Sequence, residues 1–191
     1  LLSLRALLSQ KKQGGRPVVK ASDIHEALFE AAYEGCLEAC RLLWERLSPR
    51  GKQKYVGERI NVILHRAVEN GHFEIIRFFI EECNFNVNQM DGVDQTPLSY
   101  ATNSEVMSRL LLDAGADPNQ DRPFGPLYAA VGNNNRQVVR LLLQHGADPN
   151  LNRPSSNEEH VNQRQYFRNT DHAIRNGSME ILSLLLQHGA F

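Results

Sequence analysis

The sequence predicts an all-α fold built from repeated pairs of short helices, and three observations support this prediction. A segment of about 17 residues recurs along the chain with the same order of apolar, small and polar positions. One position in its middle is repeatedly glycine, and a loop with nearly the same sequence follows two of the copies. Self-similarity of this kind is typical of repeat proteins, in which each unit buries its apolar face against its neighbours.

The composition is compatible with such a fold. Of the 191 residues, 41% are hydrophobic and 23% are charged, which is enough to form a core and unlike a disordered segment. The formal net charge of −1 gives no general attraction to nucleic acid, so we expect no nucleic-acid partner. No apolar run reaches the roughly 20 residues of a membrane-spanning helix, so we expect no membrane insertion.

The clearest copies are LHRAVENGHFEIIRFFI at 64–80 and LYAAVGNNNRQVVRLLL at 127–143. Two further copies occupy 28–44 and 170–186. A fifth copy at 98–112 has lost two residues where the others place the turn between helices. Each copy predicts two short antiparallel helices, because its apolar residues recur at helical spacing on either side of a polar turn.

The residue after the first helix is Gly35, Gly71 or Gly177 in three copies, and Asn134 in a fourth. We expect a left-handed backbone there, which glycine and asparagine adopt most readily. The recurrent loop GADPN at 115–119 and 146–150 contains aspartate and asparagine, which form turns by bonding their own backbone. Pro126 follows the first of these loops and Pro97 follows a weaker copy, ECNFNVNQMD at 82–91, and both prolines fit the first turn of a helix.

These motifs resemble the ankyrin repeat family, above all through TPLSYA, LHRAVENGH, LLLDAGADPN and LLLQHGADPN. The resemblance covers residues 24–191. It implies an ankyrin-repeat solenoid of stacked helix-turn-helix units joined by hairpin-like loops. It also implies a protein–protein interaction scaffold that binds another protein on the concave face formed by hairpin tips and first helices.

Within 24–191 we expect units beginning near 28, 64, 98, 127 and 170, with a loop insertion at about 151–168. Residues 1–23 are expected to form a helical cap or the tail of an upstream domain. The last motif stops within its loop, so Leu184 and Leu185 are expected to lack a following cover. Either more chain follows or this is a degenerate C-terminal capping repeat. We expect the chain to be an excerpt of a longer protein.

Family geometry places the partner-binding residues at the ends of the first helices and at the loop tips. They are Tyr33, Glu34, Glu69, Asn70, Met90, Val93, Gln95, Asp121, Arg122, Phe124, Gly132, Asn133, Arg175 and Asn176. Phe124 and Arg122 are the strongest candidates, because aromatic residues and arginine often dominate interfaces. The alternative for Phe124 is that it folds back and fills space left by the shortened copy.

The resemblance also implies hydroxylation of Asn119 and Asn150 by an asparaginyl hydroxylase, where such an enzyme is present. The alternative is that both side chains only stabilise the turn. We expect no catalytic, cofactor or metal site, because no phosphate-binding glycine loop, zinc motif or nucleophile elbow is present. Cys36, Cys40 and Cys83 provide no disulfide framework, which favours a cytoplasmic or nuclear location.

A second function is compatible with the same features. The uneven spacing and the insertion also fit a substrate-recruiting or regulatory module of a larger enzyme, or a secreted bacterial effector acting in the host cytosol. The basic loop at 48–59 and the insertion before Thr170 are each either solvated loops or part of a binding face. In every case the segment itself is expected to bind and not to catalyse.

Overall fold

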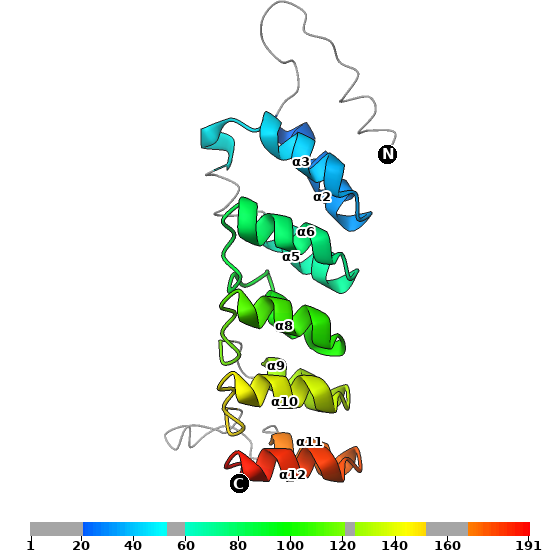
Figure 1. The fold of residues 1–191 in the computed structure, drawn as a ribbon, viewed down its shortest axis with the longest axis vertical. Coiled ribbons are helices and arrows are strands. Elements are labelled where there is room, and N and C mark those ends of the chain that lie inside the picture. Colours follow the sequence, from blue (N-terminus) through cyan, green and yellow to red (C-terminus); the bar gives the residue numbers. More distant parts are fainter. Residues whose placement is uncertain (1–20, 53–59, 121–124, 152–167) are drawn as a thin grey trace, which may run out of the picture. The chain divides into compact units, whose positions relative to one another are not determined.

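The computed structural model describes residues 21–52, 60–120, 125–151 and 168–191, and all regular secondary structure in these ranges is helical. This confirms the predicted fold class. The chain divides into two compact units, residues 1–86 and 87–191, each made of antiparallel helix pairs (Figure 1).

The described residues of the N-terminal unit form two helix pairs. Helix α2 (Ala21–Tyr33) pairs with α3 (Leu37–Arg46), and α5 (Ile60–Glu69) pairs with α6 (Phe73–Arg77), which continues as the π-helix η1 (Phe78–Glu82). The two pairs pack through α2 against α5 and through α3 against α6. Their core consists of fully buried apolar side chains, including Leu28, Leu43, Leu64, Ile76 and Phe79.

The π-helix absorbs one extra residue. The second copy has one residue more between its first apolar position, Leu64, and its loop asparagine, Asn88, than the fourth copy has. The backbone N–H of Cys83 donates to the carbonyl of Phe78 at 3.2 Å, five residues back instead of four. A single wide turn of this kind lets an inserted residue fit without moving the buried side chains on either side.

Where the structure describes the C-terminal unit, it consists of three helix pairs. The third copy forms α7 (Pro97–Tyr100), the 3-10 helix η2 (Ala101–Asn103) and α8 (Glu105–Asp113). The fourth forms α9 (Pro126–Gly132) and α10 (Arg136–Gln144), and the fifth forms α11 (Asn169–Arg175) and α12 (Met179–Gln187). First helices pack on first helices and second on second, so the three pairs are stacked.

The predicted turn chemistry is confirmed. Gly35, Gly71, Gly177 and Asn134 have φ values of +79°, +73°, +67° and +54°. Prolines 97 and 126 each stand in the first turn of their helix. The third copy has lost this left-handed turn: Ser104 caps α8 by accepting from the Met107 N–H at 3.3 Å, directly after η2.

The last pair exposes positions that the pair before it buries. Val131 and Leu143 are 0% and 5% exposed, whereas the equivalent Ile174 and Leu186 are 59% and 54% exposed. The expectation of an uncovered Leu185 is wrong, since that side chain is fully buried. The helical period turns Leu185 toward the preceding pair together with Ile181, and Leu184 is half-buried.

Candidate functional site

The loop before α7 is organised by the carboxylate of Asp91. Its Oδ1 accepts hydrogen bonds from the backbone N–H groups of Val93 (2.9 Å) and Gln95 (3.1 Å). Its Oδ2 accepts from the Tyr100 hydroxyl at 2.7 Å. A carboxylate that accepts three hydrogen bonds fixes the tip of the loop to α7. Val93 stands on this tip with 68% of its surface exposed.

Loop asparagines link each loop of the C-terminal unit to the next. The amide nitrogens of Asn88, Asn119 and Asn150 donate to the carbonyls of Gly115, Gly146 and Gly189 at 3.0, 2.9 and 2.9 Å. Their amide oxygens accept from the backbone N–H groups of Asp117, Asp148 and Phe191 at 2.7, 2.8 and 3.2 Å. The side chains expected to be hydroxylated, Asn119 and Asn150, therefore hold neighbouring loops at a fixed spacing.

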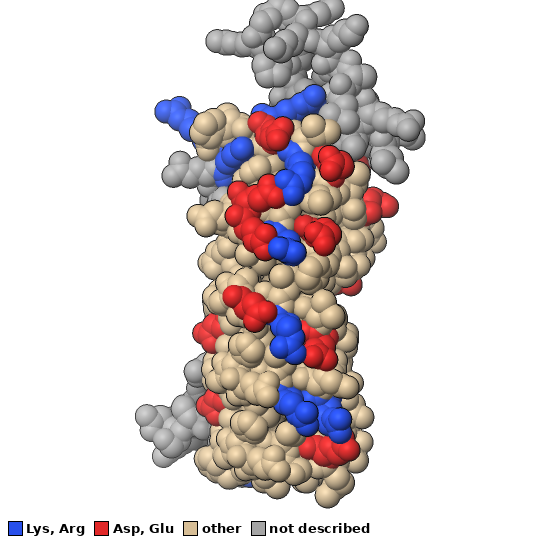
Figure 2. Space-filling view, in the orientation of Figure 1, with Lys and Arg blue, Asp and Glu red and all other residues tan. Residues whose placement is uncertain are grey.

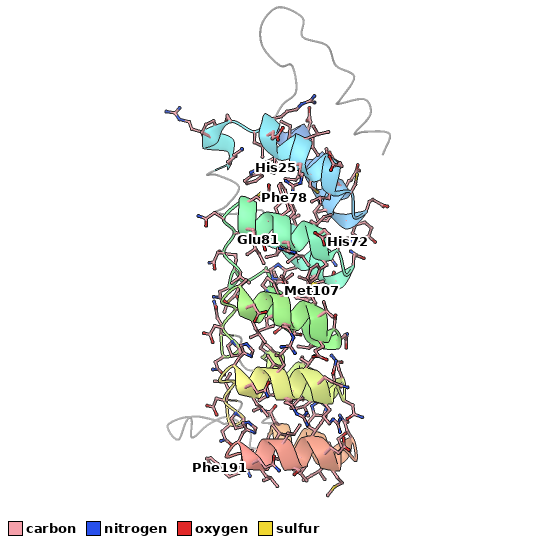
Figure 3. All side chains as sticks on the ribbon, viewed as in Figure 1. His25, His72, Phe78, Glu81, Met107 and Phe191 are labelled. Atoms are coloured by element: carbon pink, nitrogen blue, oxygen red, sulfur yellow. The ribbon has the colours of Figure 1, made fainter. Side chains whose placement is uncertain are left out.

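Several predicted residues at the helix ends also hold neighbouring pairs together. The amide of Asn133 donates to Thr102 Oγ1 at 3.1 Å, and that of Asn176 donates to the Val131 carbonyl at 3.0 Å. In the N-terminal unit, His72 Nε2 lies 2.7 Å from the Tyr33 carbonyl oxygen (His72 in Figure 3). This contact joins the turn before α6 to the turn after α2.

The remaining predicted residues differ in accessibility. Tyr33 is 49% exposed, Glu34 and Arg175 are exposed, and Met90 and Gln95 are half-buried. Glu69 pairs with Arg66, and Asn70 donates to the Arg66 carbonyl at 2.8 Å. Asp121, Arg122 and Phe124 lie outside the described residues, as do 53–59 and 152–167, so the proposals for them stay predictions.

Sequence reasoning missed two aromatic residues on the first helices, Tyr100 and Tyr128. Tyr100 holds the loop tip, and the ring of Tyr128 lies 4.7 Å from that of His172 on the next first helix. Burial lowers the pKa of His172, and Arg175 lowers it further. A tyrosine two or three residues after the helix-starting proline was the available signal.

Other side chains that the sequence singled out, in the basic loop and at the cysteines, have structural roles. The Lys52 ammonium lies 5.4 Å from the centre of the Trp44 ring, so the described start of the basic loop packs on the core. Burial raises the pKa of the Cys40 and Cys83 thiols to about 12 in each case. Within the described ranges there is no cluster of metal-ligating side chains, and no helix is long and apolar enough to cross a membrane.

The second helices present a different surface, on which basic and acidic side chains are interspersed (Figure 2). Ion pairs link Arg41 to Glu82 in the N-terminal unit and Arg136 to Glu180 in the C-terminal unit. Because these side chains are 40% or more exposed, each pair contributes little to stability.

Comparison with known proteins agrees with the repeat pattern. A family model described as ankyrin repeats, three copies, matches residues 28–122 and 64–153. No curated protein matches the chain.

Proposed function

The chain belongs to the ankyrin repeat family, and on that basis we propose that it is an interaction scaffold whose protein partner binds the loop tips and the first helices. Ankyrin repeats generally mediate protein–protein interaction, and proteins built from them are typically non-enzymatic modules. We define the loop-tip surface as the exposed part of residues 88–95, the half-buried Tyr100 of α7 and Tyr128 of α9, and the exposed side chains of α11.

The observation that carries the proposal is an exposed apolar side chain on a loop that is already ordered. Val93 is 68% exposed, and the Asp91 carboxylate holds the backbone on both sides of it. An interface built on a pre-ordered loop loses less conformational entropy on binding, so more of the contact energy becomes affinity. Tyr128 and Arg175 lie on the first helices that follow and supply residue types that are enriched in interfaces.

The chain offers a matched control for testing this surface. Val106 is 64% exposed, lies on the second helix α8 of the same unit, and has the same side chain as Val93. A photo-crosslinking residue is introduced at position 93 or at position 106 in otherwise identical protein, and crosslinking is induced in the native cell type. The proposal requires that position 93 captures a specific protein and that position 106 does not.

The captured protein is then purified and its affinity is measured for Val93→Arg and Val106→Arg. We expect Val93→Arg to weaken binding at least roughly tenfold, about 1.4 kcal/mol, and Val106→Arg to leave it unchanged. Equal effects of the two substitutions, or capture only from position 106, would place the partner elsewhere and refute the loop-tip assignment.

A further inference from the structure

One position of the second helices is arginine in four of the five helix pairs. It lies two residues before a buried apolar residue that recurs in every second helix, which is Leu43, Phe79, Leu111, Leu142 or Leu185, each at most 1% exposed. The residues at this position are Arg41, Arg77, Arg109, Arg140 and, in the last pair, Ser183. The repetition makes the surroundings of these arginines directly comparable.

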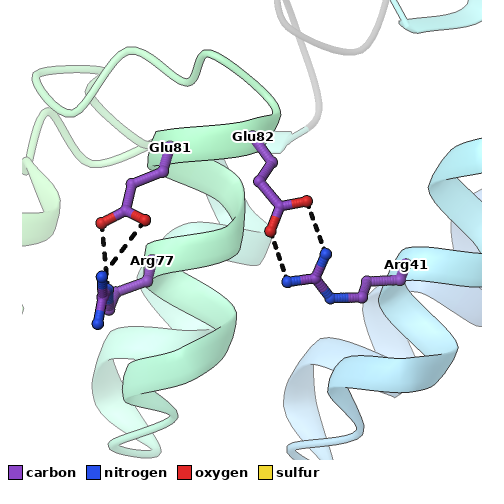
Figure 4. Close-up of polar contacts among 4 residues, drawn as sticks. All are labelled: Arg41, Arg77, Glu81 and Glu82. Atoms are coloured by element: carbon purple, nitrogen blue, oxygen red, sulfur yellow. Dashed lines mark hydrogen bonds and ion pairs between the residues drawn. The ribbon is translucent and has the colours of Figure 1, made fainter.

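Three of the four arginines are paired with a carboxylate. Arg41 bonds Glu82 of the next second helix through both terminal nitrogens, at 2.6 and 2.5 Å, and its guanidinium lies 5.0 Å from the centre of the Phe78 ring (Figure 4). Arg77 finds its partner four residues later, in Glu81, at 3.1 Å (Figure 4). Arg109 finds its partner four residues earlier, in Glu105, at 2.8 Å.

Arg140 lacks all three sources of a carboxylate. Four residues before it stands Arg136, and four residues after it stands Gln144. On α12, the second helix of the next pair, Gln187 occupies the position that Glu82 occupies relative to Arg41. Glu82 and Gln187 each lie two residues before the residue of positive φ that follows their helix. Among the described residues, the exposed Arg140 guanidinium has no hydrogen bond or ion pair.

The space in front of Arg140 is an open groove of about 410 Å³ between α10 and α12. It is lined by Arg136, Arg140, Met179, Glu180, Ser183, Leu184 and Gln187. The small Ser183 opens the groove, and Glu180 is already paired with Arg136. Leu184 stands where Phe78 lies under Arg41, and Met179 is 70% exposed. The groove thus places an unpaired guanidinium in a largely polar lining that includes two apolar side chains, Leu184 and Met179.

We propose that this Arg140 groove binds an acidic segment of a protein partner. A glutamate or aspartate carboxylate of the partner takes the place at Arg140 that Glu82 takes at Arg41, with two parallel N–H···O bonds. A neighbouring apolar side chain of the same segment packs on Leu184 and Met179. The groove lies on the second helices and is therefore separate from the loop-tip surface.

The proposal is tested with the full 191-residue chain and a defined probe, the peptide acetyl-Leu-Glu-Glu-Leu-amide. The Nε–Hε signal of Arg140, assigned through Arg140→Lys, is followed by NMR during titration. We expect a saturating shift at Arg140 with no comparable shift at the already paired Arg109. The peptide acetyl-Leu-Gln-Gln-Leu-amide should bind at least roughly tenfold more weakly, because its amides cannot form the charged bidentate pair.

Gln187→Glu is the decisive variant, since it places a carboxylate within the protein where Glu82 stands at Arg41. It should abolish the response of Arg140 to the acidic peptide, while Asn103→Asp adds the same charge outside the groove and should not. If the Arg140 signal does not shift at peptide concentrations up to about 10 mM, the proposal is overturned, because the binding free energy would then be weaker than about 3 kcal/mol. An equal affinity for acetate also overturns it, as does an unchanged response in Gln187→Glu.

Discussion

The hydroxyl of Tyr100 donates to the carboxylate of Asp91 at 2.7 Å, and this bond joins a loop tip to the first helix that follows it. Asp91 in turn accepts hydrogen bonds from the backbone N–H groups of the exposed Val93 itself and of Gln95. The position of Val93 therefore depends on helix α7, which carries Tyr100 nine residues after Asp91. The proposed binding surface depends on this bond.

Replacement of Tyr100 by phenylalanine should loosen the tip without emptying the core. The loss of a hydrogen bond to a charged group is expected to cost about 1.5–3 kcal/mol of unfolding free energy. Amide hydrogen exchange of Val93 and Gln95 should accelerate, because their common acceptor becomes mobile. Unchanged exchange at both amides in Tyr100→Phe would show that the hydroxyl does not hold the loop.

The loop asparagines should contribute more to the unfolding free energy than their half-exposed side chains suggest. Asn119→Ala removes the hydrogen bonds to both the Gly146 carbonyl and the Asp148 N–H, each with a net contribution of about 0.5–1.5 kcal/mol, so we expect a loss of about 1–3 kcal/mol. The exposed Asn103 at the end of η2 serves as the control, and Asn103→Ala should stay within about 0.5 kcal/mol. Urea unfolding of the two variants compares them, and equal stability would contradict the linking role.

The shortened third copy should be the least protected part of the array. Its first helix has only four residues, whereas the first helix of the second copy, α5, has ten. Stability in repeat proteins is distributed unit by unit, so fewer helical hydrogen bonds lower the local opening free energy. Hydrogen exchange should show less protection in residues 98–112 than in 64–80, and equal or greater protection in 98–112 would contradict this.

Substitutions of Leu142 and of Arg136 should change the unfolding free energy by very different amounts, although both residues lie on α10. Leu142 is fully buried, so Leu142→Ala is expected to cost about 2–5 kcal/mol. Arg136 is the first residue of α10, and its exposed side chain pairs with the exposed Glu180. Removal of such an exposed pair should change stability by no more than about 0.5 kcal/mol. Chemical denaturation giving the opposite order would contradict the register.

Stability should fall when His172 is forced to protonate. Burial lowers its pKa below the ordinary value of 6.5, so between the two pKa values the unfolded chain binds more protons than the folded one. This stabilisation is complete above about pH 6.5 and is lost as the pH falls through the pKa of the folded state. His172→Phe keeps a ring beside Tyr128 but does not titrate. The unfolding free energy of wild type relative to this variant should therefore decline from pH 7.5 to 5.5, and a constant difference would refute the effect.

The sequence by itself determined the repeat, its helix pairs and their turns. Leu64 and Ala67 predict a buried helical face by their spacing, and both are fully buried. Gly71 and Asn134 predict left-handed turns because few residues adopt that conformation, and both have positive φ. Such local rules depend on a residue and its near neighbours in the chain, so they can be followed without knowing the fold.

Only the tertiary structure decided which polar side chains are already engaged and which remain available. Asn133 and Asn176 looked like surface residues, yet their amides are bonded to the preceding helix pair. Arg41 and Arg140 occupy the same repeat position, but only Arg41 meets a carboxylate on the next helix. A long side chain can reach several partners, in its own helix or in the next one, and its choice depends on distances across the stack that the order of residues does not contain.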